Sequence, residues 1–235
     1  MTPPLGAWGL TGTPVPLPGG HRNTVLRVGQ HVLKSTRRSE AAITWLLPVA
    51  RHAETCGLSV PTPLRSSLGT FLVDGWTCEP LCEGGSTPPK TIADKISRLH
   101  NVAADLPQRD GFASARDLLT EPSGGDIDLA GMPTDLVFQL RAAWSAISLE
   151  TTLVHGDLNP DNILTDTDGN VTVIDWDEAR RDHPLFDTVT WTDAPTPIIK
   201  QAALAWEIAC SWQLEPEHAR SLVPSFTSAL KSGER

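Results

Sequence analysis

Basic residues are scarce in this sequence, which holds 19 lysines and arginines against 28 aspartates and glutamates. The formal net charge is −9 at pH 7, and the sequence pI is about 5.2. No stripe of basic residues is present, which argues against nucleic-acid binding as the main role. An acidic balance is compatible with a cationic substrate, although many proteins carry such a charge only as a solvated surface.

Long apolar segments are also absent. No run of residues reaches the length of a transmembrane helix, and the first ten residues, MTPPLGAWGL, lack the basic start and apolar centre of a signal peptide. Of the four cysteines only Cys78 and Cys82 lie close together, and no second pair or histidine cluster completes a zinc pattern. These absences predict a cytoplasmic protein with reduced thiols and no membrane partner.

The composition is otherwise that of a folded protein. Apolar residues make up 40% of the 235 positions, so the chain can bury a sizeable core as one large domain or two small lobes. There is no internal repeat and no long low-complexity segment. A globular fold of one or two lobes is therefore expected.

The most informative stretch runs from Leu153 to Trp176 and reads LVHGDLNPDNILTDTDGNVTVIDW. Apolar runs at 162–165 and 171–175 flank a turn-rich segment at 166–170, and this pattern predicts a β-hairpin. A polar loop precedes the first strand, and an aspartate follows the second. The hairpin therefore brings polar side chains from both places to one of its ends.

These polar side chains are Asp157, Asn162 and Asp175. Two carboxylates and one amide offer only oxygen ligands, which suit a Mg²⁺ ion that also binds phosphate. Phosphoryl transfer needs one carboxylate that faces the attacking hydroxyl, and a second carboxylate and an amide that hold metal ions on the phosphates. A polar turn whose acids are merely solvated is the simpler alternative for a short motif.

Kinases carry these groups in the same order, with an asparagine five residues after the first aspartate. The motifs H-G-D-x-x-x-x-N, at 155–162, and I-D-W, at 174–176, resemble those of the aminoglycoside phosphotransferase and choline kinase-like family. This family is a branch of the protein kinase-like fold. The resemblance implies a two-lobe α+β protein, with a small antiparallel-sheet N-lobe at 1–82 and a mainly helical C-lobe at 83–235.

The resemblance also implies an activity, which is transfer of the γ-phosphoryl group of ATP to a hydroxyl of a small molecule of the aminoglycoside, amino alcohol or sugar type. Asp157 would be the catalytic base or orienting acceptor, and Asn162 and Asp175 would hold Mg²⁺. His155 would support the loop by hydrogen bonding, and Asn159 could make a second polar contact. The identity of the acceptor, the choice between ATP and GTP, the oligomeric state, and a role in antibiotic resistance or in metabolism stay open.

Nucleotide contacts are expected in the N-lobe. Gly19 and Gly20 precede a predicted hairpin at 24–35, where backbone amides can approach phosphates closely. Lys34, in the second strand of that hairpin, would contact the α- and β-phosphates. Glu40, at the start of the next predicted helix, would be its ion-pair partner. Each residue alone is equally typical of a turn, a surface strand or a helix start.

The segment EPLCEGG, at 79–85, has the composition of a linker between lobes. In the family this linker gives backbone hydrogen bonds to adenine, which are expected here around Glu79 and Leu81. Pro80 has no N–H and cannot be the donor. Asp187, which follows a proline at a helix start, would cap that helix and tie it to the Asp157 loop, whereas His100 would bond to local backbone.

The pattern of apolar residues predicts the remaining elements. Predicted helices cover 40–47, 49–56, 91–105, 113–119, 135–149, 197–212 and 217–230, and predicted strands cover 64–66, 70–73, 76–78 and 152–154. Trp206 and Trp212, in the C-terminal helices, are expected to be core residues.

Two other functions compete with a small-molecule kinase. A nucleotide-binding regulatory module without turnover has no need to retain Asp157, Asn162 and Asp175 together. A protein kinase needs a long activation segment, which is missing after Asp175. Acidic residues of the C-lobe favour a cationic acceptor, although solvated helix faces explain them equally well; they are Asp177, Glu178, Asp182, Asp193, Glu207, Glu215 and Glu217.

Overall fold

A computed structural model describes residues 2–17 and 22–233, with side chains up to residue 228. The chain divides into two compact units. One consists of Met1–Pro88 and Asn159–Trp176, and the other of Pro89–Leu158 and Asp177–Arg235. The hairpin that carries the predicted metal ligands thus groups with the N-terminal unit, although it lies within the predicted C-lobe range.

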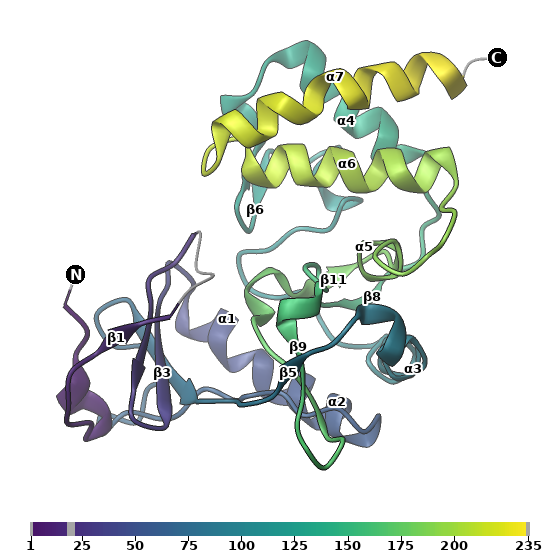
Figure 1. The fold of residues 1–235 in the computed structure, drawn as a ribbon. Coiled ribbons are helices and arrows are strands. Elements are labelled where there is room, and N and C mark those ends of the chain that lie inside the picture. Colours follow the sequence, from purple (N-terminus) through teal and green to yellow (C-terminus); the bar gives the residue numbers. More distant parts are fainter. Residues whose placement is uncertain (1, 18–21, 234–235) are drawn as a thin grey trace. The chain divides into compact units, whose positions relative to one another are not determined.

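The first unit is built on an antiparallel sheet with the strand order β1-β2-β3-β4 (Figure 1). Its strands are β1 (Val15–Pro16), β2 (Val25–Val28), β3 (His31–Ser35) and β4 (Trp76–Pro80). Gly29 has φ +59°, a conformation that glycine adopts readily, and the turn there joins β2 to β3 as predicted. Leu33, Trp76 and Cys78 form a buried core on one face, against which the short helix η1 (Leu5–Trp8) packs.

Two helices lie between β3 and β4 in the chain, α1 (Glu40–Thr44) and α2 (Leu46–Thr55). Ser39 caps α1, because its hydroxyl oxygen accepts a hydrogen bond from the Ala42 N–H at 3.1 Å. The two helices are separated at Trp45. Pro48 lies within the first turn of α2, where its missing N–H has little cost.

The predicted strands at 64–66 and 70–73 are wrong. Leu64 donates only a single hydrogen bond to the Cys78 carbonyl, and Val73 meets Trp76 in an isolated bridge. The N–H groups of residues 71 and 72 instead donate to the Glu40 carboxylate, so they form no strand ladder.

The predicted hairpin is present as β9 (Ile163–Thr165) and β10 (Val171–Val173), preceded by the short helix η5 (Pro160–Asn162). Strand β5 (Gly85–Ser86) joins it, in the order β10-β9-β5. In the turn, the Asp166 carboxylate accepts hydrogen bonds from Asn170 Nδ2 and from the N–H groups of Asn170 and Asp168. The Asn170 side chain and these amides hold the pKa of Asp166 below its usual value.

The second unit is mainly helical. Its helices are α3 (Ala93–Val102), α4 (Thr134–Ser145), α5 (Leu185–Thr188), α6 (Pro197–Ser211) and α7 (Pro216–Gly233). Figure 1 shows α6 running beside both α4 and α7, and these helices bury Trp144, Trp206 and Phe226 in a shared core. Strand β8 (Thr152–Val154) pairs with β11 (Arg180–Asp182).

Short elements complete the second unit. They are η2 (Pro89–Ile92), η3 (Asp117–Leu119), β6 (Ser123–Gly124), β7 (Ile127–Asp128) and η4 (Leu129–Gly131). A further short helix, η6 (Trp176–Glu178), begins at the last residue of the first unit and continues into the second unit. The predicted helix at 113–119 is reduced to η3, and the β6–β7 hairpin was not predicted. No helix within the described ranges is long and apolar enough to cross a membrane.

Candidate active site

The loop that follows β8 consists of His155, Gly156 and Asp157, and a buried carboxylate holds it. Asp187 Oδ2 accepts from the His155 N–H at 3.0 Å, and Oδ1 accepts from the Gly156 N–H at 2.9 Å. His100 Nε2 lies 2.9 Å from Oδ2. Burial alone would raise the pKa of Asp187, but the hydrogen bond and charge of His100, the charge of His155 and the Gly156 amide outweigh it and lower that pKa.

This network confirms two expectations and corrects two. Asp187 ties α5 to the loop, as predicted, but the N-cap position belongs to Pro184. His100 bonds to Asp187 rather than to local backbone only. His155 is buried, and its Nδ1 accepts from the Asp157 N–H at 3.3 Å, as expected of a supporting histidine.

Gly156 sits against a buried guanidinium. Its φ is +84°, and an added Cβ would lie 2.6 Å from Arg180 Nη1 and 2.9 Å from the Glu178 carbonyl oxygen. Arg180 has no exposed surface, donates from Nε to Asp182 Oδ2 at 2.8 Å, and stacks 3.5 Å from the centroid of the Trp206 ring. Trp206 is therefore a core residue, as predicted.

Sequence reasoning missed this support because the pattern A-R-R-D does not separate the buried Arg180 from its neighbour Arg181, which is half-buried. Only the pairing of β11 with β8 assigns Arg180 to the inner face. The buried charge is tolerated because Asp182 and the Glu178 carbonyl accept from the guanidinium.

Asp157 itself is exposed on the second unit, and four residues separate it from Asn162 in the sequence. Asn162 lies in η5 of the first unit and is 8% exposed. Asn159, for which a substrate contact was suggested, caps this short helix, because its Oδ1 accepts from the N–H groups of Asp161 and Asn162. Asn162 is thus held by the capped turn that starts the hairpin.

Asp175 follows β10 and has a φ of +60°, a left-handed conformation that is uncommon outside glycine. Its side chain is 45% exposed, and Oδ1 lies 3.4 Å from Lys34 Nζ. These two residues are 141 positions apart in the sequence. The first unit therefore brings the predicted phosphate-binding lysine to one of the predicted metal ligands. An exposed carboxylate with an amide on the same hairpin is a donor set that fits Mg²⁺.

The acid that pairs with Lys34 is not the predicted one. Glu79 Oε1 lies 2.9 Å from Lys34 Nζ. The Glu40 carboxylate instead accepts hydrogen bonds from the N–H groups of Phe71 and Leu72. The predicted Lys34–Glu40 ion pair is therefore wrong, and Glu79 of β4 is the acid that contacts Lys34.

The linker also differs from its predicted register. The Leu81 N–H, the predicted donor to adenine, donates to the Gln30 carbonyl at 2.9 Å and so extends the pairing of β4 with the β2–β3 turn. Residues 81–84 lie between β4 and β5, and 82–84 are those that follow this hydrogen bond of Leu81. Gly19 and Gly20 lie outside the described residues.

Three of the seven acidic residues singled out in the sequence form ion pairs. Asp182 binds the buried Arg180, Asp193 pairs with Lys90 at 2.9 Å, and Glu207 pairs with His218 at 3.1 Å. The first of these is fully enclosed, and the other two are surface ion pairs of small energetic value.

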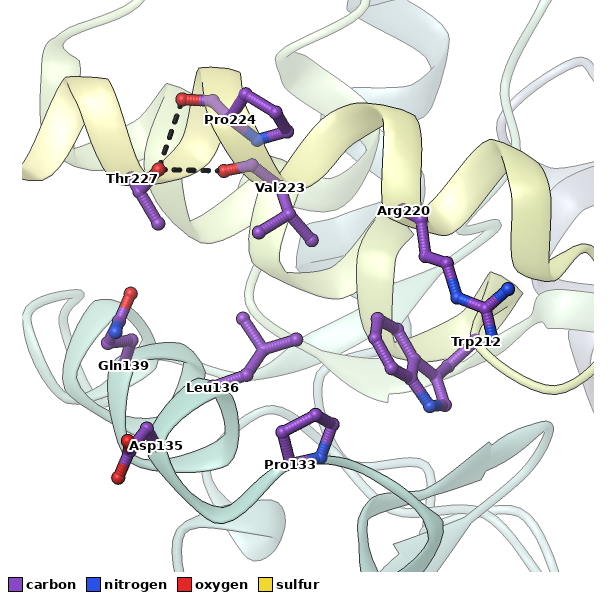
Figure 2. Close-up of a pocket in the computed structure, with 9 residues that line it drawn as sticks. All are labelled: Pro133, Asp135, Leu136, Gln139, Trp212, Arg220, Val223, Pro224 and Thr227. Atoms are coloured by element: carbon purple, nitrogen blue, oxygen red, sulfur yellow. Dashed lines mark hydrogen bonds between the residues drawn. The ribbon is translucent and has the colours of Figure 1, made fainter.

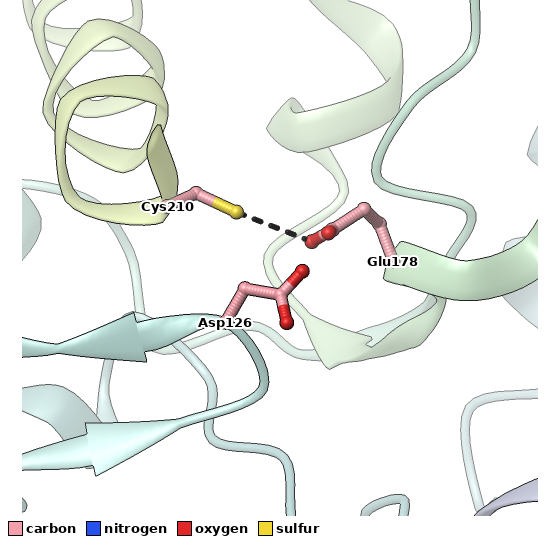
Figure 3. A group of neighbouring side chains, drawn as sticks. All are labelled: Asp126, Glu178 and Cys210. Carbon is pink, nitrogen blue, oxygen red and sulfur yellow. Dashed lines mark hydrogen bonds between the residues drawn. The ribbon is translucent and has the colours of Figure 1, made fainter. Parts of the chain in front are cut away.

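Glu178 is different, because it lies beside the Asp157 loop. Its Cβ would be 3.3 Å from a Cβ on Gly156. Figure 3 shows Glu178 facing Asp126, from the β6–β7 turn, and Cys210, from α6. Ligand atoms of the three residues lie within 4.8 Å of one another, and the Cys210 thiol donates to Glu178 at 3.5 Å. The second unit thus groups two carboxylates and a thiol around Glu178, a residue that adjoins the loop.

A separate apolar cavity of about 630 Å³ lies between α4 and α7. Figure 2 shows Leu136 of α4 and Val223 of α7 facing each other across it, with Trp212 and Arg220 at one end. None of its nine lining residues is a predicted site residue.

Comparison with known proteins shows the family to which the chain belongs. A profile described as the phosphotransferase enzyme family (APH) matches residues 13–216. Choline kinase LicA from Streptococcus pneumoniae has a similar structure, with a TM-score of 0.61 at 15% identity over 95% of each chain. No curated protein matches the sequence.

Two other solved structures are similar. Macrolide 2′-phosphotransferase MphH from Brachybacterium faecium gives a TM-score of 0.52 at 20% identity over 96% of this chain and 86% of that one. APH(2″)-IIa, in a ternary complex with streptomycin and ATP, gives 0.52 at 15% identity over 88% and 81%. At these identities the similarity concerns the fold.

The fold is therefore that of the protein kinase-like phosphotransferases, an α+β architecture with an antiparallel sheet and a helical part, as predicted. The chain belongs to the phosphotransferase enzyme family, as its motifs indicated. The family match identifies the chain as a phosphotransferase.

Proposed function

We propose that this enzyme transfers the γ-phosphoryl group of ATP to a hydroxyl of a small, amine-bearing molecule. The observation that carries the nucleotide assignment is the approach of Lys34 Nζ to Asp175 Oδ1 at 3.4 Å, across 141 residues of sequence. A cation for phosphate and a carboxylate for metal are needed side by side in phosphoryl transfer. The ATP complex of a structurally similar phosphotransferase supports the choice of nucleotide.

Each residue has a distinct role in this proposal. The exposed Asp157 carboxylate accepts the hydrogen bond of the acceptor hydroxyl and orients its oxygen. Asn162 and Asp175 are the residues that would hold Mg²⁺, which when bound neutralises charge on the phosphates. Lys34 contacts the phosphates, Gly19 and Gly20 cover them, and 82–84 replaces Leu81 as the segment that contacts adenine.

The second unit supports an acceptor that carries an amine. Glu178, whose carbonyl oxygen and Cβ adjoin Gly156 next to Asp157, groups its carboxylate with that of Asp126. Such a pair attracts an ammonium group, and the attraction weakens as salt screens it. Asp182, Asp193 and Glu207 form ion pairs with Arg180, Lys90 and His218, which partly neutralise their charges within the unit.

The test is to incubate the protein with Mg²⁺ and γ-labelled ATP against amino sugars, amino alcohols, neutral sugars, hydroxy acids and a generic protein. We expect label on amine-bearing hydroxyl compounds at low salt. Asp157→Asn should keep nucleotide binding and lose about 10²- to 10⁴-fold in transfer rate. Asp161→Asn, an exposed acid of the same segment, is the matched control and should transfer normally.

The outcomes separate the parts of the proposal. Transfer to neutral sugars or hydroxy acids but not to amines would reject the amine-bearing acceptor and leave the kinase assignment standing. Nucleotide binding without transfer to any compound would favour the regulatory module instead. Full activity of Asp157→Asn would show that another group orients the hydroxyl.

A further inference from the structure

The lysine that faces Asp175 is held by a strand residue. In the register of β3 and β4, Lys34 is opposite Thr77 and Val32 is opposite Glu79. Lys34 and Glu79 are therefore diagonal neighbours on one face of the sheet, within reach of long side chains. The other face of the same strands carries Leu33, Trp76 and Cys78 in the core.

Both partners of this pair are poorly exposed. The side chain of Lys34 is 14% exposed and that of Glu79 is 17% exposed, whereas that of Asp175 is 45% exposed. Charges with little solvent contact are screened less, so their interaction is stronger than that of a surface pair. The ammonium also lies nearer to Glu79, at 2.9 Å, than to Asp175, at 3.4 Å.

Glu40, the acid at the start of α1, binds other groups. Glu40 Oε1 accepts from the Phe71 N–H at 2.9 Å, and Oε2 accepts from Phe71 at 3.2 Å and Leu72 at 2.8 Å. A carboxylate with these bonds anchors the 71–72 backbone to the start of α1, and moving it toward Lys34 would leave two amides without this acceptor.

We propose that Glu79 is the positioning residue for Lys34 and that it limits the pairing of Lys34 with Asp175. Without Glu79, Lys34 would be drawn more fully to Asp175 and would compete with Mg²⁺ for that carboxylate. With Glu79 present, Lys34 stays beside the site while an oxygen of Asp175 remains available to the ion. This inference rests on the proposed nucleotide site, and it assigns to β4 a task that sequence reasoning had assigned to α1.

The experiment measures binding of a fluorescent ATP analogue at a series of Mg²⁺ concentrations, together with the melting temperature of each variant without ligands. The variants are Glu79→Gln, Lys34→Met, the double variant, and Glu40→Gln as the matched control. We expect Glu79→Gln to weaken binding about tenfold and to raise the Mg²⁺ concentration needed for half-maximal binding. The same change in the Lys34→Met background should have no further effect.

Glu40→Gln should lower the melting temperature and leave binding and its Mg²⁺ dependence unchanged. Glu79→Asp keeps the charge on a shorter side chain, so its nucleotide affinity should lie between those of wild type and Glu79→Gln. This variant replaces Glu79→Gln in the test if Glu79→Gln does not fold.

Each other result decides the question. Weaker binding by Lys34→Met with normal binding by Glu79→Gln would overturn the positioning role and leave the proposed function intact. An equal effect of Glu79→Gln in both backgrounds would mean that Glu79 acts without Lys34, which also overturns it. Normal binding by Lys34→Met would reject the phosphate contact itself and thus this part of the proposed function.

Discussion

At the scale of single residues, Gly156 shows how strictly the loop geometry limits the sequence. Two independent constraints meet there, a φ of +84° and contact with the buried Arg180 and the Glu178 carbonyl. Gly169, in the β9–β10 turn, has almost the same φ, +83°, but no heavy atom lies within 4 Å of a Cβ built on it. A comparison of substitutions at the two glycines therefore distinguishes the cost of backbone strain from the cost of steric overlap.

We expect Gly156→Ala to cost about 1–2 kcal/mol for the left-handed conformation and a further 1–3 kcal/mol, roughly, for overpacking against Arg180. Gly169→Ala should cost about 1–2 kcal/mol only. Urea denaturation of both variants measures the difference, and transfer assays should show reduced turnover for Gly156→Ala alone. Equal destabilisation would mean that the Arg180 side chain gives way without cost.

At the scale of elements, one carboxylate joins three parts of the second unit. Asp187 of α5 bonds His100 of α3 and two amides of the loop after β8. The bonds to the ionised carboxylate outweigh its burial, so its pKa in the folded protein is below the value of about 3.9 for an unfolded chain. A lowered carboxyl pKa stabilises the fold above the unfolded value, and that stabilisation is lost as the pH falls through the folded value.

We therefore expect Asp187→Asn to lower the free energy of unfolding by about 3 kcal/mol at pH 7, since it removes a buried charge from its partners. The difference from wild type should shrink as the pH falls below about 3.9, the unfolded value, towards the lower folded value at which wild-type Asp187 becomes protonated. Denaturation curves between pH 3 and pH 7 measure this. A difference that stays constant over the whole range would show that the charge of Asp187 does not contribute.

At the scale of the whole molecule, ligand binding should increase the stability of the folded protein. A ligand that binds only the folded state at one hundred times its Kd adds about 2.7 kcal/mol. We expect ADP to raise the melting temperature more with Mg²⁺ than with EDTA. Asp175→Asn should abolish this Mg²⁺-dependent part, and asparagine is chosen because it tolerates the φ of +60°.

The control for this change is Asp168→Ala, an exposed acid in the turn at the other end of the same hairpin. It should keep the full Mg²⁺-dependent shift. An unchanged shift in Asp175→Asn would exclude Asp175 as a metal ligand, whereas loss of the shift in both variants would point to damage to the hairpin itself.

The elements could be predicted where the pattern of residues is local and strong. The 162–175 hairpin, the 24–35 hairpin and the long C-terminal helices were predicted within a few residues. The strands at 64–66 and 70–73 failed because Glu40, more than thirty positions away, supplies the acceptor for the backbone at 71–72. A strand ladder was therefore replaced by a side-chain contact that no local pattern encodes.

The sequence by itself determined the family and the candidate chemical groups, because Asp157, Asn162 and Asp175 are ordered by spacing and by one hairpin. Only the tertiary structure decided which acid holds Lys34, where the strand pairing at Leu81 ends, and which arginine lies buried under Gly156. The reason is physical: each of these depends on strand register or on packing between distant segments. A shift of one residue in register would turn Glu79 to the opposite face of the sheet, away from Lys34.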